Sequence, residues 1–257
     1  MKAVISNDDG VHSEGISALV RAARKAGFET YVVAPDREQS ASSHALTMHR
    51  PLRVLKTDER TWVVDGTPTD CVNIAVCNVL KDSRPDFVFS GINSGPNLGD
   101  DVTYSGTVAC AFEGTLLGVR SIAFSLDVLR EESAAIDWTG AEAAAYELIL
   151  YARDNPPSPE TLWNVNIPPG RPKGFRPTRM GRRRYGENIV EKIDPRGKPY
   201  FWIGGTFVDT PADGTDLNAV AEGYVSVTPL HLDLTDYRAL ADMQKLKERF
   251  GTNGSPG

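Results

Sequence analysis

An acidic pair closes the first apolar run of the chain. Residues 3–6 are Ala-Val-Ile-Ser, and Asn7, Asp8, Asp9 and Gly10 follow directly. Two adjacent carboxylates repel each other unless a cation or a shared proton relieves them. Mg²⁺ and Mn²⁺ prefer oxygen ligands, typically one or two carboxylates with water and phosphate oxygens. A solvated acidic turn is the alternative, but ligands of open α/β sheets bind beyond the carboxyl ends of strands, where this pair lies.

Further polar side chains follow later apolar runs. Ser40 comes after the run 30–34, and Asn93 and Asn97 come after the run 86–90. Because the carboxyl ends of parallel neighbouring strands meet at one edge of a sheet, these groups can converge on the acidic pair. Each residue alone is weak evidence, since polar loop residues usually form turns. Their position at successive strand ends favours an all-oxygen site for Mg²⁺ or Mn²⁺.

A glycine-rich loop and a helix start follow the same buried run. Residues 90–99 contain three glycines and two asparagines, and Ser105-Gly106-Thr107 opens a predicted helix. Glycine lets backbone N–H groups approach an anion closely, and a helix N-terminus presents free N–H donors with a partial positive charge. The segment therefore suits a phosphate, with an ordinary capped helix as the alternative.

Several other chemistries lack their motifs. The glycines are not followed by the lysine of a P-loop, no Gly-x-Gly-x-x-Gly follows the first strand, and no Gly-x-Ser-x-Gly occurs. These absences disfavour a P-loop NTPase, a dinucleotide enzyme and a serine hydrolase. Metal and phosphate chemistry therefore ranks above a nucleophilic serine.

The totals describe an acidic globular protein. A net charge of −6 and a pI near 5.3 argue against binding to a nucleic-acid polymer or to an anionic membrane. The three cysteines show no Cys-x-x-Cys spacing and are expected to be buried thiols in a reducing compartment. Without a basic, apolar leader or an apolar run of membrane-spanning length, we expect a cytoplasmic protein.

Three other polar features are interpreted as structural. His44 lies in the loop after the second strand, where it could contact substrate but is expected to be solvated. The run 182–184 is Arg-Arg-Arg and is expected to be a solvated basic segment rather than a phosphate site. The second acidic pair, Asp100-Asp101, is expected to serve loop structure because it does not lie at a strand end.

The elements that position these residues alternate in type. Hydrophobic periodicity and capping signals predict strands over 3–6, 30–34, 46–56, 61–65, 86–90, 120–125 and 163–167, and helices over 15–26, 67–80, 106–117 and 139–152. This order predicts a Rossmann-like α/β core over residues 1–170, with a mostly parallel sheet and helices on both faces.

The chain changes character after residue 170. Frequent prolines and glycines separate β-rich pieces near 200–203 and 224–228, and 236–250 is an amphipathic helix pattern. We expect residues 171–257 to form a β-rich extension with a terminal helix, as one structural unit with the core.

Six ordered motifs resemble the SurE family of survival proteins. They are residues 6–10, 33–37 with Ser40, 65–72, 90–97, 104–108 and 223–230. The resemblance spans nearly the whole chain. It implies a Rossmann-like phosphatase that hydrolyses nucleoside monophosphates, acting as a 5′-nucleotidase and also on 3′-nucleotides, with one Mg²⁺ or Mn²⁺ ion per subunit.

The resemblance also assigns residues. Asp8 and Asp9 would carry the catalysis, and family members are commonly dimers or tetramers joined by exchanged C-terminal segments. The extension is therefore expected to form a homodimer or homotetramer. The family's metal ligands fall on Asp8, Asp9, Ser40 and Asn93, and its phosphate neighbourhood falls on Asn97, Ser105, Gly106 and Thr107.

Three other functions stay open. A signalling receiver also has an acidic pair after its first strand, but it needs an aspartate after the third strand and a lysine near the fifth, where this chain has Asn93 and Ser125. A nucleotide-binding or assembly protein could use the metal only structurally. A broad phosphatase or exopolyphosphatase would share the mechanism and differ in substrate.

Overall fold

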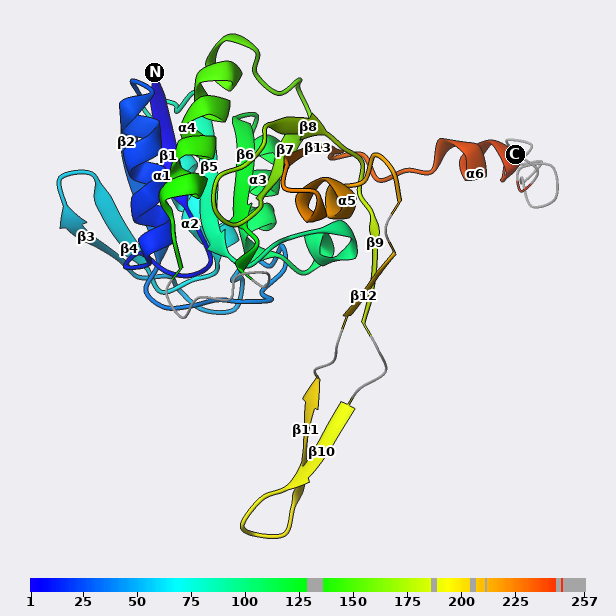
Figure 1. The fold of residues 1–257 in the computed structure, drawn as a ribbon. Coiled ribbons are helices and arrows are strands. Elements are labelled where there is room, and N and C mark those ends of the chain that lie inside the picture. Colours follow the sequence, from blue (N-terminus) through cyan, green and yellow to red (C-terminus); the bar gives the residue numbers. More distant parts are fainter. Residues whose placement is uncertain (129–135, 186–188, 204–206, 211, 244–245, 247–257) are drawn as a thin grey trace, which may run out of the picture.

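A nine-stranded sheet organises the protein (Figure 1). The computed structural model describes residues 1–128, 136–185, 189–203, 207–210, 212–243 and 246. The six strands from β4 to β7 in the sheet order run parallel, whereas β3 runs antiparallel to β4 and β13 runs antiparallel to β7. The edge strand β8 runs parallel to β13. This confirms the predicted mostly parallel α/β fold. The strand order is β3 (Val54–Asp58), β4 (Thr61–Val64), β2 (Glu29–Pro35), β1 (Lys2–Ser6), β5 (Phe87–Ser94), β6 (Arg120–Leu126), β7 (Thr161–Ile167), β13 (Val225–His231) and β8 (Phe175–Pro177).

Helices cover both faces of this sheet, as predicted. On one face α1 and α4 pack together, and on the other face α2 packs against α3 (Figure 1). The predicted N-termini of three helices are confirmed. Ser13 and Ser105 cap α1 and α3, and Thr67 forms a capping box with Asp70 at the start of α2. The four helices are α1 (Glu14–Lys25), α2 (Pro68–Ile74, continued by a π-helical turn over Ala75–Val79), α3 (Gly106–Leu116) and α4 (Thr139–Asp154).

The central strands are buried on both sides. In β1, Ala3 and Ile5 join the core beneath α1 and α4, whereas Val4 joins the core beneath α2. The alternation follows the period of two of a strand, whose successive side chains point to opposite faces. This double burial holds the strand ends, and the loops that follow them, in fixed places.

Two predicted elements differ in the structure. The strand predicted over 46–56 begins only at Val54, because Pro51 cannot donate to a strand ladder and Thr47 N–H bonds to the Asp70 carboxylate at 2.9 Å instead. The helix predicted over 236–250 is present as α6 (Tyr237–Asp242). Of the remainder, 244–245 and 247–250 lie outside the described residues.

Part of the predicted extension belongs to the main sheet. β13 pairs with β7, and β8 pairs with β13, while α5 (Asp216–Ala221) packs close to β13. The rest forms an arm in which β9 (Arg182–Tyr185) pairs with β12 (Phe207–Thr210), and β10 (Ile189–Ile193) pairs with β11 (Pro199–Ile203). Figure 1 shows the β10–β11 hairpin and α6 projecting away from the sheet. Across the described residues, every helix is too short or too polar to cross a membrane.

Candidate active site

The strand order reverses between β1 and β5. β2 lies on one side of β1, and β5, β6 and β7 follow on the other side. Ligands of such sheets bind in the crevice beyond the carboxyl ends of the strands at this reversal. Asp8 and Asp9 follow β1, and Asn93 lies near the end of β5, where Ser6 and Ser90 are paired in register. The topology therefore brings the predicted metal ligands of two strands to one crevice.

Asn7 shapes the acidic turn. Its side-chain amide nitrogen donates to the Gly10 carbonyl (3.0 Å) and to Ser13 Oγ (2.8 Å), and its oxygen accepts from Gly10 N–H (3.2 Å). Gly10 has a φ of 94°, which a residue with a Cβ rarely adopts. The fully buried Asn7 thus joins the acidic turn to the cap of α1.

Hydrogen bonds from the protein only partly stabilise the charged forms of Asp8 and Asp9. Asp8 is only 5% exposed, and burial raises its pKa to about 6 against the hydrogen bond from Thr107 Oγ1, with Asp9 adding to the rise. Burial also raises the pKa of Asp9, opposed by the N–H of Ser94 at 3.1 Å and reinforced by Glu38. A bound cation would relieve both carboxylates, so this donor pair fits a hard divalent metal.

The segments that contain the other two predicted metal ligands contact this pair through their backbones. Gln39 N–H donates to the Asp8 carbonyl at 2.8 Å, which places the Ser40 loop against the acidic turn. The exposed Ser40 hydroxyl itself donates to Glu38 at 2.6 Å. Asn93 donates its amide nitrogen to the Gly95 carbonyl at 2.8 Å, so its oxygen is the end that could ligate a cation.

The start of α3 abuts Asp8. A Cβ on Gly106 would lie 2.8 Å from Asp8 Cβ, 3.0 Å from Asp8 Oδ2 and 2.9 Å from Ser42 Oγ. Ser105 caps the helix by accepting from Val108 N–H at 3.0 Å, and Thr107 bonds to Asp8. The first N–H groups of a helix lack partners within it. The structure therefore places donors suited to a phosphate next to the carboxylates suited to a metal.

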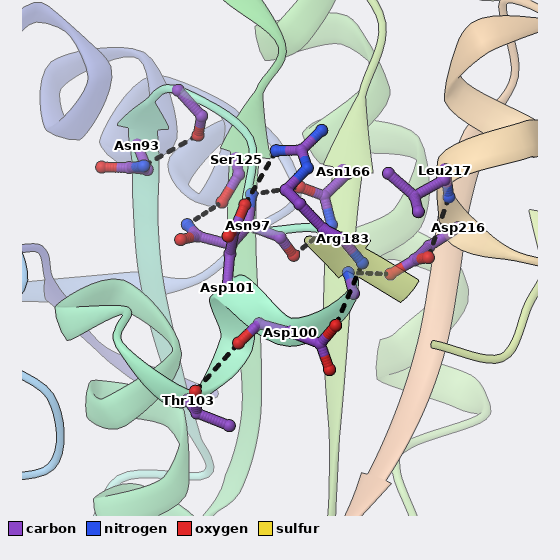
Figure 2. Close-up of polar contacts among 12 residues, drawn as sticks. Asn93, Asn97, Asp100, Asp101, Thr103, Ser125, Asn166, Arg183, Asp216 and Leu217 are labelled. Atoms are coloured by element: carbon purple, nitrogen blue, oxygen red, sulfur yellow. Dashed lines mark hydrogen bonds and ion pairs between the residues drawn. The ribbon is translucent and has the colours of Figure 1, made fainter. Parts of the chain in front are cut away.

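Asn97 is bound to the sheet. It is buried, and its amide nitrogen donates to Ser125 Oγ at 2.7 Å (Figure 2). Its backbone N–H donates to Asn166 Oδ1 at 2.7 Å, and its carbonyl accepts from Asn164 and Asn166 at 2.8 and 3.0 Å. These contacts attach the loop between β5 and α3, residues 95–105, to β6 and β7. We call this segment the site loop.

A buried carboxylate that sequence analysis did not identify, that of Glu113, lies next to His44. His44 Nε2 lies 2.9 Å from Glu113 Oε2, and Glu113 Oε1 accepts from Asn73 at 2.8 Å. The hydrogen bond with His44 lowers the pKa of Glu113, against its burial. The expectation of a merely solvated His44 is therefore wrong. Glu113 lies seven residues after Gly106, two turns along the same face of α3. This spacing is the feature of the sequence that could have indicated Glu113 as a residue near the site.

The basic run and the second acidic pair meet in a buried contact. Arg183 Nη1 lies 2.8 Å from Asp101 Oδ2, and the two residues are 4% and 8% exposed. Asp100 and Asp101 lie in the short 3₁₀ helix η2 (Gly99–Thr103). The prediction of a solvated run is wrong at Arg183 because alternate side chains of β9 point to opposite sides, leaving Arg182 exposed.

Comparison with known proteins identifies relatives along nearly the full chain. The family model described as "Survival protein SurE" matches residues 3–187. Proteins named 5′-nucleotidase SurE from Anaeromyxobacter dehalogenans (strain 2CP-C) and Myxococcus xanthus are 52% and 51% identical over 238 and 243 residues. These alignments cover 91% and 93% of this chain and 91% of each relative.

A solved structure agrees with the fold. The crystal structure of the SurE protein from Aquifex aeolicus superposes with a TM-score of 0.84 at 41% identity, covering 96% of this chain and 100% of that one. The family model, the relatives and the solved structure all identify the same family. The chain therefore belongs to the SurE family of survival proteins.

Proposed function

We propose that the protein is a divalent-metal-dependent phosphomonoesterase that hydrolyses nucleoside monophosphates to nucleoside and phosphate. The observation that carries the proposal is the acidic pair of the buried Asp8 and the half-buried Asp9, with Asp8 held against the start of α3. The names of its relatives, 5′-nucleotidase SurE, support the 5′-nucleotidase activity. We expect activity on 3′-nucleotides as well.

Different residues would bind the metal and the phosphate. Asp8, Asp9, Ser40 and Asn93 would hold one Mg²⁺ or Mn²⁺ ion, which when bound polarises phosphate oxygens and water. The N–H groups at Gly106 and Thr107 would stabilise the charge of the phosphoryl group, with Ser105 capping the helix that presents them and Asn97 fixing their loop on the sheet. Thr107 holds Asp8 in place by its hydrogen bond.

Phosphate release from nucleotides tests this function. We expect release from 5′- and 3′-nucleoside monophosphates with Mn²⁺ or Mg²⁺ and none after EDTA. Including p-nitrophenyl phosphate and polyphosphate in the same panel separates a nucleotidase from a broad phosphatase or an exopolyphosphatase. Well-folded protein that releases no phosphate with either metal would contradict the proposal and favour a non-catalytic binding protein. The SurE family membership gives no support to the receiver alternative.

We propose that the extension joins copies of the chain into a homodimer or homotetramer. The β10–β11 hairpin exposes Ile189, Ile193, Phe201 and Trp202, each at least 58% exposed, and Leu234 before α6 is 86% exposed. Apolar surface of this extent marks interaction sites.

Light scattering tests the assembly. Trp202→Glu is expected to lower the molar mass in solution, because it places a charge among the exposed apolar side chains of the hairpin. Glu191→Gln on the same hairpin is the matched control and is expected to assemble as the wild type does. A wild-type monomer would refute the assembly. The thiols of Cys71, Cys77 and Cys110 are free, which supports the proposed cytoplasmic location. Cys77 is exposed, so the expectation of a buried thiol is wrong at that position.

A further inference from the structure

The site loop is held from two sides. On one side Asn97 is bound to β6 and β7, as described above. On the other side the turn η2 contacts β9, which is the base of the arm, and the start of α5 (Figure 2). The contacts of Asn97 are with the main sheet, whereas the contacts of η2 are with the extension. The contacts of η2 therefore join the arm to the active site.

The Arg183–Asp101 ion pair is the buried part of this junction. The two side chains are 2% and 10% exposed, and a second contact from Arg183 N–H to Asp100 Oδ2 at 3.0 Å joins the same segments. Removing one partner of a buried ion pair is strongly unfavourable. The turn is therefore expected to rearrange when the guanidinium is lost.

Asp216 makes a second contact with the same turn. Its carboxylate accepts from Gly99 N–H at 2.8 Å, from Gly181 N–H at 2.7 Å and from Leu217 N–H at 2.8 Å. Gly99 has a φ of 54°, and a Cβ there would lie 3.0 Å from the Gly181 carbonyl oxygen. The backbones of the turn and of the arm base therefore approach closely, and the Asp216 carboxylate bonds to both.

Asp101 connects this junction to the catalytic end of α3. Its carbonyl accepts from Tyr104 N–H at 3.0 Å and from Ser105 N–H at 3.1 Å. Ser105 caps α3, and Gly106 and the hydroxyl of Thr107 lie against Asp8. The side chain of Asp101 thus bonds the arm while its backbone fixes the residues that face the acidic pair.

We propose that Arg183 is a positioning residue for the active site, acting through Asp101 to fix the start of α3 relative to Asp8. The inference rests on the proposed phosphomonoesterase function and adds a residue of the extension to it. Small displacements of groups that orient a substrate reduce turnover strongly. Arg183 itself need not touch the nucleotide.

Arg183→Gln beside Arg182→Gln tests this role, since each variant removes one positive charge from β9 and Arg182 is exposed. We expect Arg183→Gln to lower kcat/KM for a nucleoside monophosphate, per folded enzyme, by about 10- to 100-fold. Amide hydrogen exchange should speed up over residues 99–108, where Asp101 protects the Tyr104 and Ser105 amides. Arg182→Gln should match the wild type in both measurements.

Two further outcomes keep the test decisive. Arg183→Lys keeps the charge without the planar fork and is expected to give intermediate values, which also covers a failure of Arg183→Gln to fold. Wild-type kinetics in folded Arg183→Gln, or in Arg183→Lys if only that variant folds, would overturn the positioning role. If the wild type itself releases no phosphate, the proposed function fails, and exchange over 99–108 alone then decides whether Arg183 holds the start of α3.

Discussion

Asp8→Asn is expected to lower metal-dependent phosphate release by roughly 10³-fold or more while making the metal-free protein more stable. The loss follows because the variant removes one of the two carboxylates that would hold the metal. The gain follows from burial, which raises the pKa of Asp8 from its usual 3.8 to about 6. A neutral amide at this position avoids burying a charge and can still accept from Thr107.

The stability gain depends on pH in a definite direction. Because the folded state holds the Asp8 proton more tightly than the unfolded state, the metal-free wild type loses stability as pH rises through the interval from about 4 to about 6. At neutral pH the difference between variant and wild type is at most about 3 kcal/mol, and it vanishes below that interval.

Urea unfolding in EDTA on both sides of this interval measures the effect. Asp82→Asn is the matched control, since Asp82 is exposed, and it should retain the activity and the stability of the wild type. An Asp8→Asn protein with full metal-dependent turnover would contradict the assignment of the acidic pair. A variant no more stable than the wild type at neutral pH would contradict the buried, unrelieved charge.

Gly106→Ala is expected to reduce kcat/KM by about 10²-fold, because its Cβ would lie only 2.8 Å from Asp8 Cβ and 2.9 Å from Ser42 Oγ. Either Asp8 or the start of α3 must move to accept the methyl group. Alanine is otherwise favourable in a helix, so the loss should be local to the site.

Gly114→Ala in the same helix is the control for packing strain. Its Cβ would lie 2.5 Å from Ser121 Oγ and 2.8 Å from Val88 Cγ2, on the side of α3 that packs against the sheet. We expect Gly114→Ala to unfold at lower urea and to retain its kcat/KM per folded molecule. If Gly106→Ala keeps wild-type kinetics, or if both variants lose activity only in proportion to unfolding, the start of α3 does not form part of the site.

Local signals predicted much of this architecture. The Thr67-Pro68 start of α2 and the serine caps of α1 and α3 depend on side chains within three residues of the helix, so the sequence contains the whole interaction. The position of Asp8 and Asp9 after an apolar strand likewise needs only the strand and the rule that ligands bind beyond strand ends.

Contacts between distant segments could not be predicted in this way. The Arg183–Asp101 pair joins residues 82 apart, and His44–Glu113 joins residues 69 apart. Each depends on how two elements are placed by the rest of the core. A charge run and a lone histidine look the same in sequence whether solvated or paired, so pattern alone favoured the commoner solvated state at Arg183 and His44.

The place of β13 in the sheet has a consequence for how the protein is made. β13 pairs along β7 from residue 226 to residue 231 and holds β8 on its other side. While the chain is being synthesised, β7 therefore carries an open edge until residues 226–231 have emerged. Unpaired strand edges of this kind are the surfaces on which nascent chains aggregate and chaperones act. The candidate active-site segments 8–107 are made first, but the sheet that supports them is completed only after residue 231 has been made.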